Sequence, residues 1–143
     1  MRIIQIIDSL DWGGAQKLQV IFANQVRSLD VHLTIIALHN RDCGISIHAD
    51  LAAAGAEPIY LPAPRILNIK RLRRILQIIR EKNVDLIHSH LTFANILGAI
   101  VGWLTNTPVI ATLHSERFDH IDPRWQLMEK WALRYGARKI IAV

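Results

Sequence analysis

The sequence predicts an α/β protein built on an open, doubly wound, mainly parallel sheet of about six strands with helices on both faces. Two observations carry this prediction. Short apolar runs alternate along the chain with segments of helical periodicity, in the order β-α-β-α-β-α-β-α-β-α-β. Most of these runs are nearly continuous rather than alternating, which is typical of strands covered on both faces.

The expected strands follow one another along the whole chain. The first, Arg2–Ile7, has the sequence RIIQII and leads into the polar stretch DSLDWGG. The other strands are expected at His32–Leu38, Glu57–Leu61, Val84–His88, Val109–Leu113 and Lys139–Val143. These runs are rich in isoleucine, valine and leucine, which suit the interior of a sheet.

The segments between these runs have the pattern of helices. They are expected at Ala15–Ser28, Ile47–Ala54, Ile69–Lys82, Phe93–Thr105 and Pro123–Tyr135. Gly55 and Gly136 follow the second and the fifth of them, and glycine commonly stands just past the end of a helix. Two tryptophans of the last segment, Trp125 and Trp131, are expected to pack in the core.

In a sheet of this kind ligands bind beyond the carboxyl ends of the strands. The loops that lie at that edge are expected at Asp8–Ala15, His39–Ser46, Pro62–Asn68, Ser89–Thr92 and Ser115–Asp122. Glycines, histidines and prolines gather in these loops, so this edge is where we expect the functional site.

Composition sets the class of protein. With 143 residues, 51% hydrophobic and 20% charged, the chain has material for one domain with a core and does not resemble a disordered protein. No apolar run reaches the length of about 18 residues that spans a membrane, and the first residues lack a signal-peptide pattern. The single cysteine, Cys43, excludes an internal disulfide and fits a reducing compartment, so we expect a cytoplasmic protein. The net charge of +5 favours anionic partners.

Two adjacent glycines, Gly13 and Gly14, stand between the first strand and the first helix. Backbone N–H groups at a helix N-terminus bind phosphate, and glycine leaves the approach to them open. Lys17, one turn later, adds positive charge, and we expect Trp12 to form a wall of the same cleft. A flexible turn is the alternative, because neither the P-loop pattern nor GxGxxG is present.

Three histidines close neighbouring strands. His88 and His90 in LIHSHL are two residues apart and therefore face the same way, and His114 ends the next strand in TLHSE. A histidine at this edge donates to a substrate hydroxyl or phosphate, or acts as acid or base. Glu116 and Asp119 follow in the next loop as candidates to orient it. The alternative is that these histidines only form hydrogen bonds at the strand ends. A metal site would need a third and a fourth ligand, so we expect no bound metal.

The segment NIKRLRRILQIIREK predicts an amphipathic basic helix. The apolar arc consists of Ile69, Leu72, Ile75, Leu76 and Ile79. The cations around the rest of the helix are Lys70, Arg71, Arg73, Arg74 and Arg80. A crossover helix with a solvated face explains this pattern; the alternative is contact of the first four cations with anionic lipid headgroups. Nucleic acid is not expected, because no aromatic residues interleave with these cations.

The ordered set of motifs resembles a known family. A strand followed by GGAQK, the strand ends VDLIHSHL and PVIATLHSE, and the later GARKIIAV are similar to the N-terminal half of GT-B glycosyltransferases of the retaining family 4. The resemblance covers essentially the whole chain. It implies a Rossmann-like domain of a hexosyltransferase that moves a sugar from a nucleotide-sugar to a glycan or glycolipid acceptor, with retention and without a metal or other cofactor.

The resemblance also implies roles for single residues. Gly13 and Gly14 approach the donor diphosphate, and His114 lies near the transferred sugar and the reacting centre. The leaving diphosphate is stabilised by positive groups and helix N-termini. Where the family pattern has an acid after GGA, this sequence has Gln16, so any role of that carboxylate is open here.

The donor-binding C-terminal half of such enzymes, with its two glutamates seven residues apart, has no counterpart in this sequence. We therefore expect residues 1–143 to be the N-terminal, acceptor-side domain of a longer, truncated enzyme, inactive when alone. Cell-envelope polysaccharide synthesis at the cytoplasmic face of a membrane, as a peripheral protein, is the expected setting. The alternatives are half of a GT-B sugar-nucleotide epimerase and a catalytically silent binding module.

Overall fold

The computed structural model describes residues 1–40, 46–114 and 122–143. Six parallel strands form one sheet in the order β3-β2-β1-β4-β5-β6. The strands are β1 (Arg2–Ile7), β2 (His32–Ala37), β3 (Ile59–Tyr60), β4 (Leu86–His90), β5 (Val109–Leu113) and β6 (Lys139–Ala142). The helices are α1 (Gly14–Val26), α2 (His48–Ala53), α3 (Ile69–Glu81), α4 (Thr92–Thr105) and α5 (Pro123–Gly136). The predicted fold class is confirmed.

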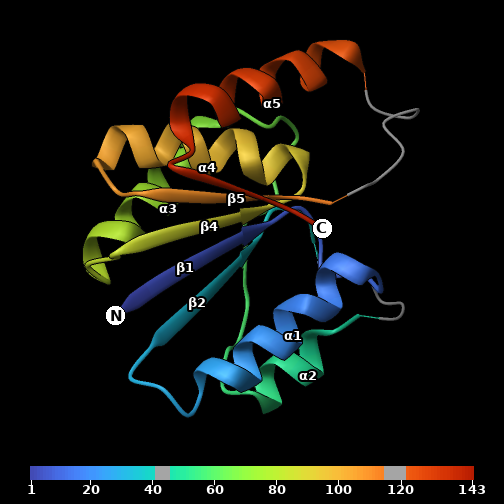
Figure 1. Ribbon diagram of the computed structural model, residues 1–143, viewed down its shortest axis with the longest axis vertical. Helices are drawn as coiled ribbons and strands as arrows, with labels where there is room; N and C mark the ends of the chain where they lie inside the picture. Colours follow the sequence, from blue (N-terminus) through green and yellow to red (C-terminus); the bar gives the residue numbers. More distant parts are fainter. Residues whose placement is uncertain (41–45, 115–121) are drawn as a thin grey trace.

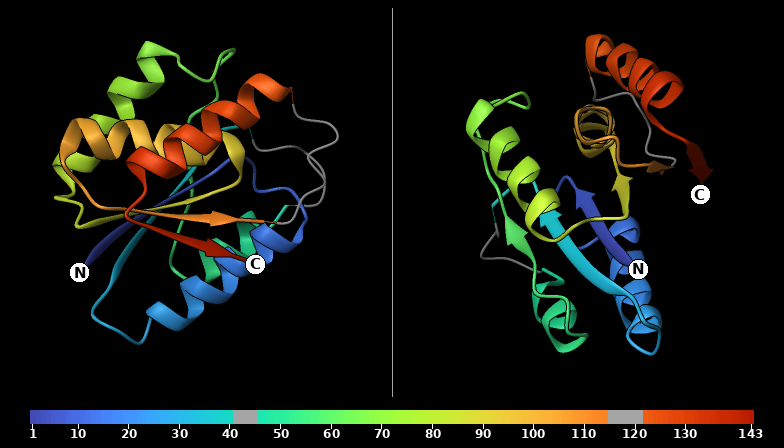
Figure 2. Two further views of the ribbon diagram at one scale, coloured as in Figure 1. Left: turned by 45° about the horizontal axis from the view of Figure 1, so that its top comes forward. Right: turned by 90° about the vertical axis from the view of Figure 1, so that its left-hand side faces the viewer.

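Helices cover both faces of the sheet. Figure 1 and Figure 2 show α1 and α2 on one face and α3, α4 and α5 on the other. The chain builds β1, β2 and β3 outward on one side and then crosses to β4, which pairs with β1 on the other side. The sheet therefore reverses its direction of winding between β1 and β4, the place where ligands bind in open α/β sheets.

Alternation along β1 explains why there are two cores. Ile4 and Ile6 face α3 and α4, where they meet a cluster that includes Ile75 and Leu97. Ile7 belongs to the second cluster, against α1 and α2. Each core thus buries one face of the same strand, which accounts for the continuous apolar run in the sequence.

Four strands differ from their predicted bounds, and β2 and β6 do so by only one residue at the end. β3 spans only Ile59–Tyr60, because Pro58 before it has no N–H to donate to a sheet. β4 ends two residues later than predicted, since its ladder with β1 continues to the pair of Ile7 and His90. Both histidines of LIHSHL are therefore inside the strand.

The last helix differs from the prediction in the direction of its tryptophans. Trp131 was expected in the core but is 59% exposed, and its ring lies 4.8 Å from that of Tyr135. The opposite side of α5 packs on α4 through Glu129, which is 3% exposed and accepts hydrogen bonds from the Thr92 hydroxyl and the Asn95 amide. That polar contact fixes the rotation of the helix and turns Trp131 outward. None of the described helices is long and apolar enough to cross a membrane.

Candidate functional site

The N-terminus of α1 opens at the carboxyl edge of the sheet, directly after β1. Gly13 is the N-cap residue, with an extended backbone (φ −173°) and no side-chain cap. Neither glycine of the pair has a positive φ. A Cβ on Gly14 would meet no atom within 4 Å, so open space lies beside the first N–H groups of the helix. These groups have no partner within the helix, and such a helix end is where anions bind.

Trp12 and Lys17 lie at the same helix end. The Lys17 ammonium is 4.4 Å from the centroid of the Trp12 ring, a cation–π contact. Trp12 is 57% exposed. Gln16, in the position of the family's acid, is nearly buried, and its amide donates to the Ser9 carbonyl at 3.3 Å. The first turn of α1 therefore carries no acid, and its dipole and Lys17 make this corner positive.

The three predicted histidines come together on the α1 side of the sheet. The His88 and His90 ring centroids are 4.1 Å apart, and those of His90 and His114 are 5.5 Å apart. His90 Nδ1 is hydrogen-bonded to His114 Nε2 at 3.2 Å. His88 bonds the Thr112 hydroxyl at 2.9 Å and the Gln5 amide at 3.4 Å. The same-face spacing read from the sequence is thus confirmed.

Burial keeps two of these rings neutral. It lowers the pKa of His88 to about 4, with a further contribution from the charge of His114. It lowers the pKa of His90 to about 2, with further contributions from His88 and His114. His114 lies at the open end of the row, half-buried, just after β5. The predicted contact of His114 with a ligand stays a prediction.

A second feature of this edge was not anticipated from the sequence. The carboxylate of Asp8, just after β1, accepts hydrogen bonds from the backbone N–H groups of Phe93 (3.2 Å) and Ala94 (2.6 Å) at the start of α4. Leu91, the N-cap residue of α4, has no capping side-chain bond and holds a φ of 73°, in the left-handed region. Asp8, which follows β1, thus caps the helix that follows β4. The only sequence signal was an acid at a strand end.

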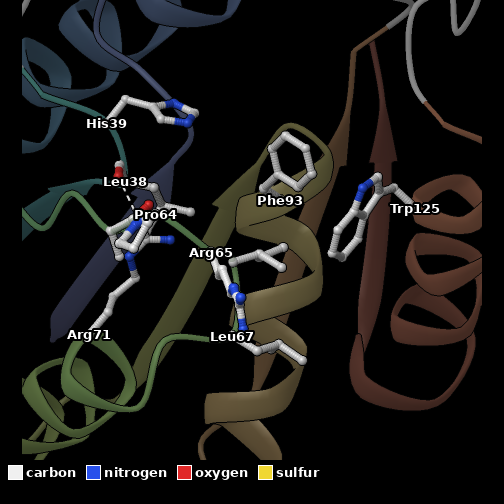
Figure 3. Close-up of a pocket in the computed structure, with 10 residues that line it drawn as sticks. Leu38, His39, Pro64, Arg65, Leu67, Arg71, Phe93 and Trp125 are labelled. Carbon is white, nitrogen blue, oxygen red and sulfur yellow. Dashed lines mark hydrogen bonds between the residues drawn. The ribbon is translucent and has the colours of Figure 1, made fainter.

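On the opposite side of the sheet lies a cavity of about 580 Å³. It is formed by the ends of β2 and β3, the loop before α3, and the first turns of α3, α4 and α5 (Figure 3). The lining residues are Leu38, His39, Ala63, Pro64, Arg65, Ile66, Leu67, Arg71, Phe93 and Trp125. Phe93 and Trp125 meet edge to face, with ring centroids 5.6 Å apart. Aromatic, apolar and cationic groups thus converge in one space.

The predicted site residues lie elsewhere. The described residues that line this cavity do not include Trp12, Lys17, His88 or His90. The sequence pointed to the loops after β2 and β3, but Phe93 and Trp125 are missing from its candidates because each reads as an ordinary helical core position. Glu116 and Asp119 lie outside the described residues.

Arg71 corrects the reading of α3 as a helix with a fully solvated cationic face. It is 6% exposed, and its guanidinium donates to the carbonyls of Leu61 (2.8 Å), Leu38 (3.0 Å) and Ala63 (3.2 Å). Burial lowers the pKa of Arg71, whereas the charge of Asp8 raises it. Because the loop before α3 folds over this position, Arg71 is not a membrane contact.

The other cations of α3 lie where the periodicity places them. Lys70, Arg73 and Arg74 are exposed, and Arg74 lies 3.9 Å from Glu81 on the same helix. Among the residues that the structure describes, no group of three or more histidine, cysteine or carboxylate side chains is arranged to hold a metal ion.

Comparison with solved structures identifies the architecture. HepE from Anabaena in complex with UDP matches with a TM-score of 0.78 and 17% identity, over 98% of this chain and 37% of that one. MurG from Acinetobacter baumannii matches with a TM-score of 0.68 and 10% identity, over 99% and 41%. A UDP-N-acetylglucosamine 2-epimerase matches with a TM-score of 0.60 and 12% identity, over 99% and 41%. The chain thus spans about two fifths of the length of each.

The sequence itself matches Glycosyltransferase Family 4 over residues 12–143. A search of curated protein sequences found no match. The low identities of the solved structures show the fold alone, whereas the family match spans almost the whole sequence. The chain therefore belongs to Glycosyltransferase Family 4, and its sheet is the Rossmann-like N-terminal half of the GT-B fold.

Proposed function

We propose that this chain is the acceptor-side half of a retaining hexosyltransferase, which moves a sugar from a nucleotide-sugar to a glycan or glycolipid acceptor. One observation carries the proposal. The carboxyl edge of the sheet presents an uncapped helix N-terminus at Gly13 and Gly14 on one side and an aromatic, cationic cavity on the other. Two separate sites at one edge suit a reaction between two substrates.

The α1 corner suits the donor diphosphate. Its free N–H groups, its dipole and Lys17 offer positive charge where negative charge grows as the diphosphate leaves. His114 then lies near the transferred sugar, as a hydrogen-bond donor to it or to the leaving group. The proposal needs no metal ion, because these groups supply the electrostatic stabilisation. The HepE structures in complex with UDP and with UDP-glucose support a nucleotide-sugar at this fold.

The cavity on the α3, α4 and α5 side suits the acceptor. Apolar and aromatic walls bind the faces of sugar rings, and Phe93 and Trp125 supply such walls. Arg65 and His39 at the cavity mouth offer hydrogen bonds to hydroxyl groups or to an anionic substituent. We place the acceptor here rather than against His88 and His90, whose rings lie beneath α1 on the other face.

The cellular setting is part of the same proposal. We place the enzyme in cell-envelope polysaccharide synthesis, in the cytoplasm and peripherally on an anionic membrane surface. The exposed cations Lys70, Arg73 and Arg74 support this placement. A GT-B sugar-nucleotide epimerase is the second candidate, favoured by the match to a UDP-N-acetylglucosamine 2-epimerase over 99% of this chain.

The native gene product decides between these functions. An antibody raised against residues 1–143 first measures its mass, and a band at about two to three times 16.3 kDa is expected for a two-domain enzyme. The purified product is then incubated with nucleotide-sugars and host glycolipids. A glycosylated lipid or glycan supports the proposal, and an epimerised nucleotide-sugar without transfer favours the second candidate. A band at 16.3 kDa would contradict the two-domain architecture.

A further inference from the structure

Arg71 is an unusual residue to find in the wall of a cavity. Its side chain is 94% buried, and three hydrogen bonds to backbone carbonyls use its Nε and Nη2 atoms. Among the described residues, none accepts a hydrogen bond from Nη1. The guanidinium lines the cavity (Figure 3). The Nε and Nη2 edge of the guanidinium is thus held by backbone carbonyls, and Nη1 remains available to a ligand.

Among the described residues, no carboxylate forms an ion pair with Arg71. Asp8 favours its charged form, but the two oxygens of that carboxylate accept the N–H groups at the start of α4. The described residues that line the cavity include Arg65, Arg71 and His39 and no acid. A buried cation whose hydrogen bonds go to neutral carbonyls, in a cavity that Arg65 also lines, favours an anion in that cavity.

The other lining residues of the cavity indicate which kind of molecule carries the anionic group. Phe93 and Trp125 form an aromatic corner, and Leu67, which is 53% exposed, widens the mouth with an apolar surface. The cavity therefore offers an anionic ligand both cationic side chains and an apolar, aromatic lining.

We infer that this cavity recognises a phosphate group of the acceptor, held by Arg71 Nη1 and Arg65. The inference rests on the proposed function for calling the ligand an acceptor, but the phosphate site itself does not depend on sugar transfer. The phosphate belongs either to a phosphorylated glycan or to a lipid diphosphate. Both present the same oxygens to the two guanidinium groups.

The test uses the ¹⁵N-labelled chain in solution at constant ionic strength. Glucose 1-phosphate, farnesyl diphosphate and neutral methyl glucoside are titrated in turn, and shifts of the Arg71 Nε–H, the Arg65 Nε–H and the Trp125 indole N–H are followed. Both phosphates are expected to move these signals, and methyl glucoside is expected to bind at least about tenfold more weakly, for want of charge-assisted hydrogen bonds. The phosphate that binds more tightly identifies its source.

Matched variants locate the site. Arg65→Gln is expected to weaken phosphate binding about tenfold, the effect of one lost charge-assisted contact. Arg80→Gln removes the same charge from the exposed side of α3 and is expected to change nothing. Arg71→Lys keeps a charge but loses the second edge of the fork, and its expected loss is larger. Folding of each variant is checked from the same spectra.

Three results would overturn the inference: equal affinity for methyl glucoside, phosphate binding that is insensitive to Arg65→Gln, or shifts confined to Gly13, Gly14 and Lys17. Each would leave the proposed function standing, because it removes only the charge of the acceptor. Phosphate binding at Arg65 together with a native product that transfers no sugar would instead overturn the proposed function and keep the phosphate site.

Discussion

The Nδ1 atom of His90 lies 3.2 Å from Nε2 of His114, so two histidines at the ends of neighbouring strands share one hydrogen bond. His90 is 4% exposed and, with its pKa lowered to about 2 by burial, stays neutral at physiological pH. Its other nitrogen, Nε2, has no hydrogen-bond partner in the part of the chain that is described. A buried N–H without an acceptor is rarer than a buried lone pair, so His90 carries its proton on Nδ1 and donates it to His114.

This hydrogen bond makes His90 a positioning residue for His114. In the native gene product, His114→Ala is expected to lower kcat on the order of 100-fold. His90→Phe is expected to lower kcat about tenfold with little change in the donor KM, because His114 loses its fixed tautomer and orientation. His90→Asn keeps a donor and should recover part of the rate. A change in KM with kcat preserved would contradict this role.

The partly buried His88 predicts a loss of stability in acid. Its folded pKa of about 4 lies below that of an exposed histidine, so the unfolded chain takes up the proton first and stability falls as the pH drops below about 6.5. Between about pH 7 and about pH 4.5, His88 should account for about 2 kcal/mol of this loss.

Urea unfolding at the two pH values measures this contribution. His88→Gln is expected to flatten the pH dependence of the unfolding free energy by that amount. His32→Gln, at an exposed strand end, is the matched control for the loss of a histidine. Equal pH dependence in wild type and His88→Gln would show that His88 is protonated as easily in the folded protein as in the unfolded chain.

The capping of α4 by Asp8 predicts a stability defect far from that residue in sequence. Asp8→Ala is expected to lower the unfolding free energy by about 2 kcal/mol, because the N–H groups of Phe93 and Ala94 lose their acceptor and the helix dipole loses a charge. Asp8→Asn should lose less. Chemical denaturation measures both, with Asp30→Ala as a control on an exposed carboxylate. An unchanged free energy of unfolding in Asp8→Ala would mean that water replaces the carboxylate as acceptor at no cost.

The open space beside Gly14 predicts variants that fold normally but bind a diphosphate poorly. A Cβ there meets no atom within 4 Å and the backbone φ is not positive, so Gly14→Ala and Gly14→Val should keep the stability of wild type. Under the proposed function, both side chains obstruct the approach of the donor diphosphate to the α1 N–H groups. Gly14→Val should then weaken the binding of a nucleoside diphosphate to the native gene product about tenfold, as measured by calorimetry. Unchanged affinity in a folded Gly14→Val would place the diphosphate elsewhere.

The exposed cations of α3 predict salt-sensitive membrane binding. Replacing Lys70, Arg73 and Arg74 together by glutamine is expected to weaken the affinity for phosphatidylserine vesicles on the order of 100-fold at low salt, since each charge contributes about 1 kcal/mol. Added salt should reduce the effect, because exposed charges are screened. Vesicles of phosphatidylcholine are the control for charge. Binding that survives the triple substitution and high salt would assign the contact to an apolar surface, such as the exposed Trp131 on α5.

Most of the fold could be predicted because each strand is a local signal. Runs such as RIIQII mark a buried parallel strand wherever the chain goes next, and β1 has the predicted bounds. The shortened β3 shows the limit, since Pro58 interrupts pairing within an otherwise apolar run. The gathering of His88, His90 and His114 was also predictable, because a two-residue spacing and a shared sheet edge are set by topology.

The cavity was harder to predict because its walls depend on contacts between distant segments. Helical periodicity places Arg71 on the polar arc of α3 but does not show that the preceding loop folds over it and offers carbonyls. Trp125 and Trp131 are both tryptophans of α5, yet Trp125 lines the cavity beside α3 and Trp131 is exposed in an apolar groove along α4 and α5. The contacts of Glu129 fix the rotation of the helix that separates them. Such buried polar contacts have no signature in the sequence.

The loop between β3 and α3 is fastened at both ends. Arg71 bonds the carbonyls of Leu61 and Ala63, and the Asn68 side chain accepts the N–H groups of Lys70 and Arg71 at the start of the helix. The residues between these anchors, 64–67, form one wall of the cavity. Because the anchors hold the backbone of this segment, we expect its side chains to be replaceable at little cost to the stability of the fold. Specificity for a new acceptor could therefore be engineered, or could evolve, through changes in four consecutive codons.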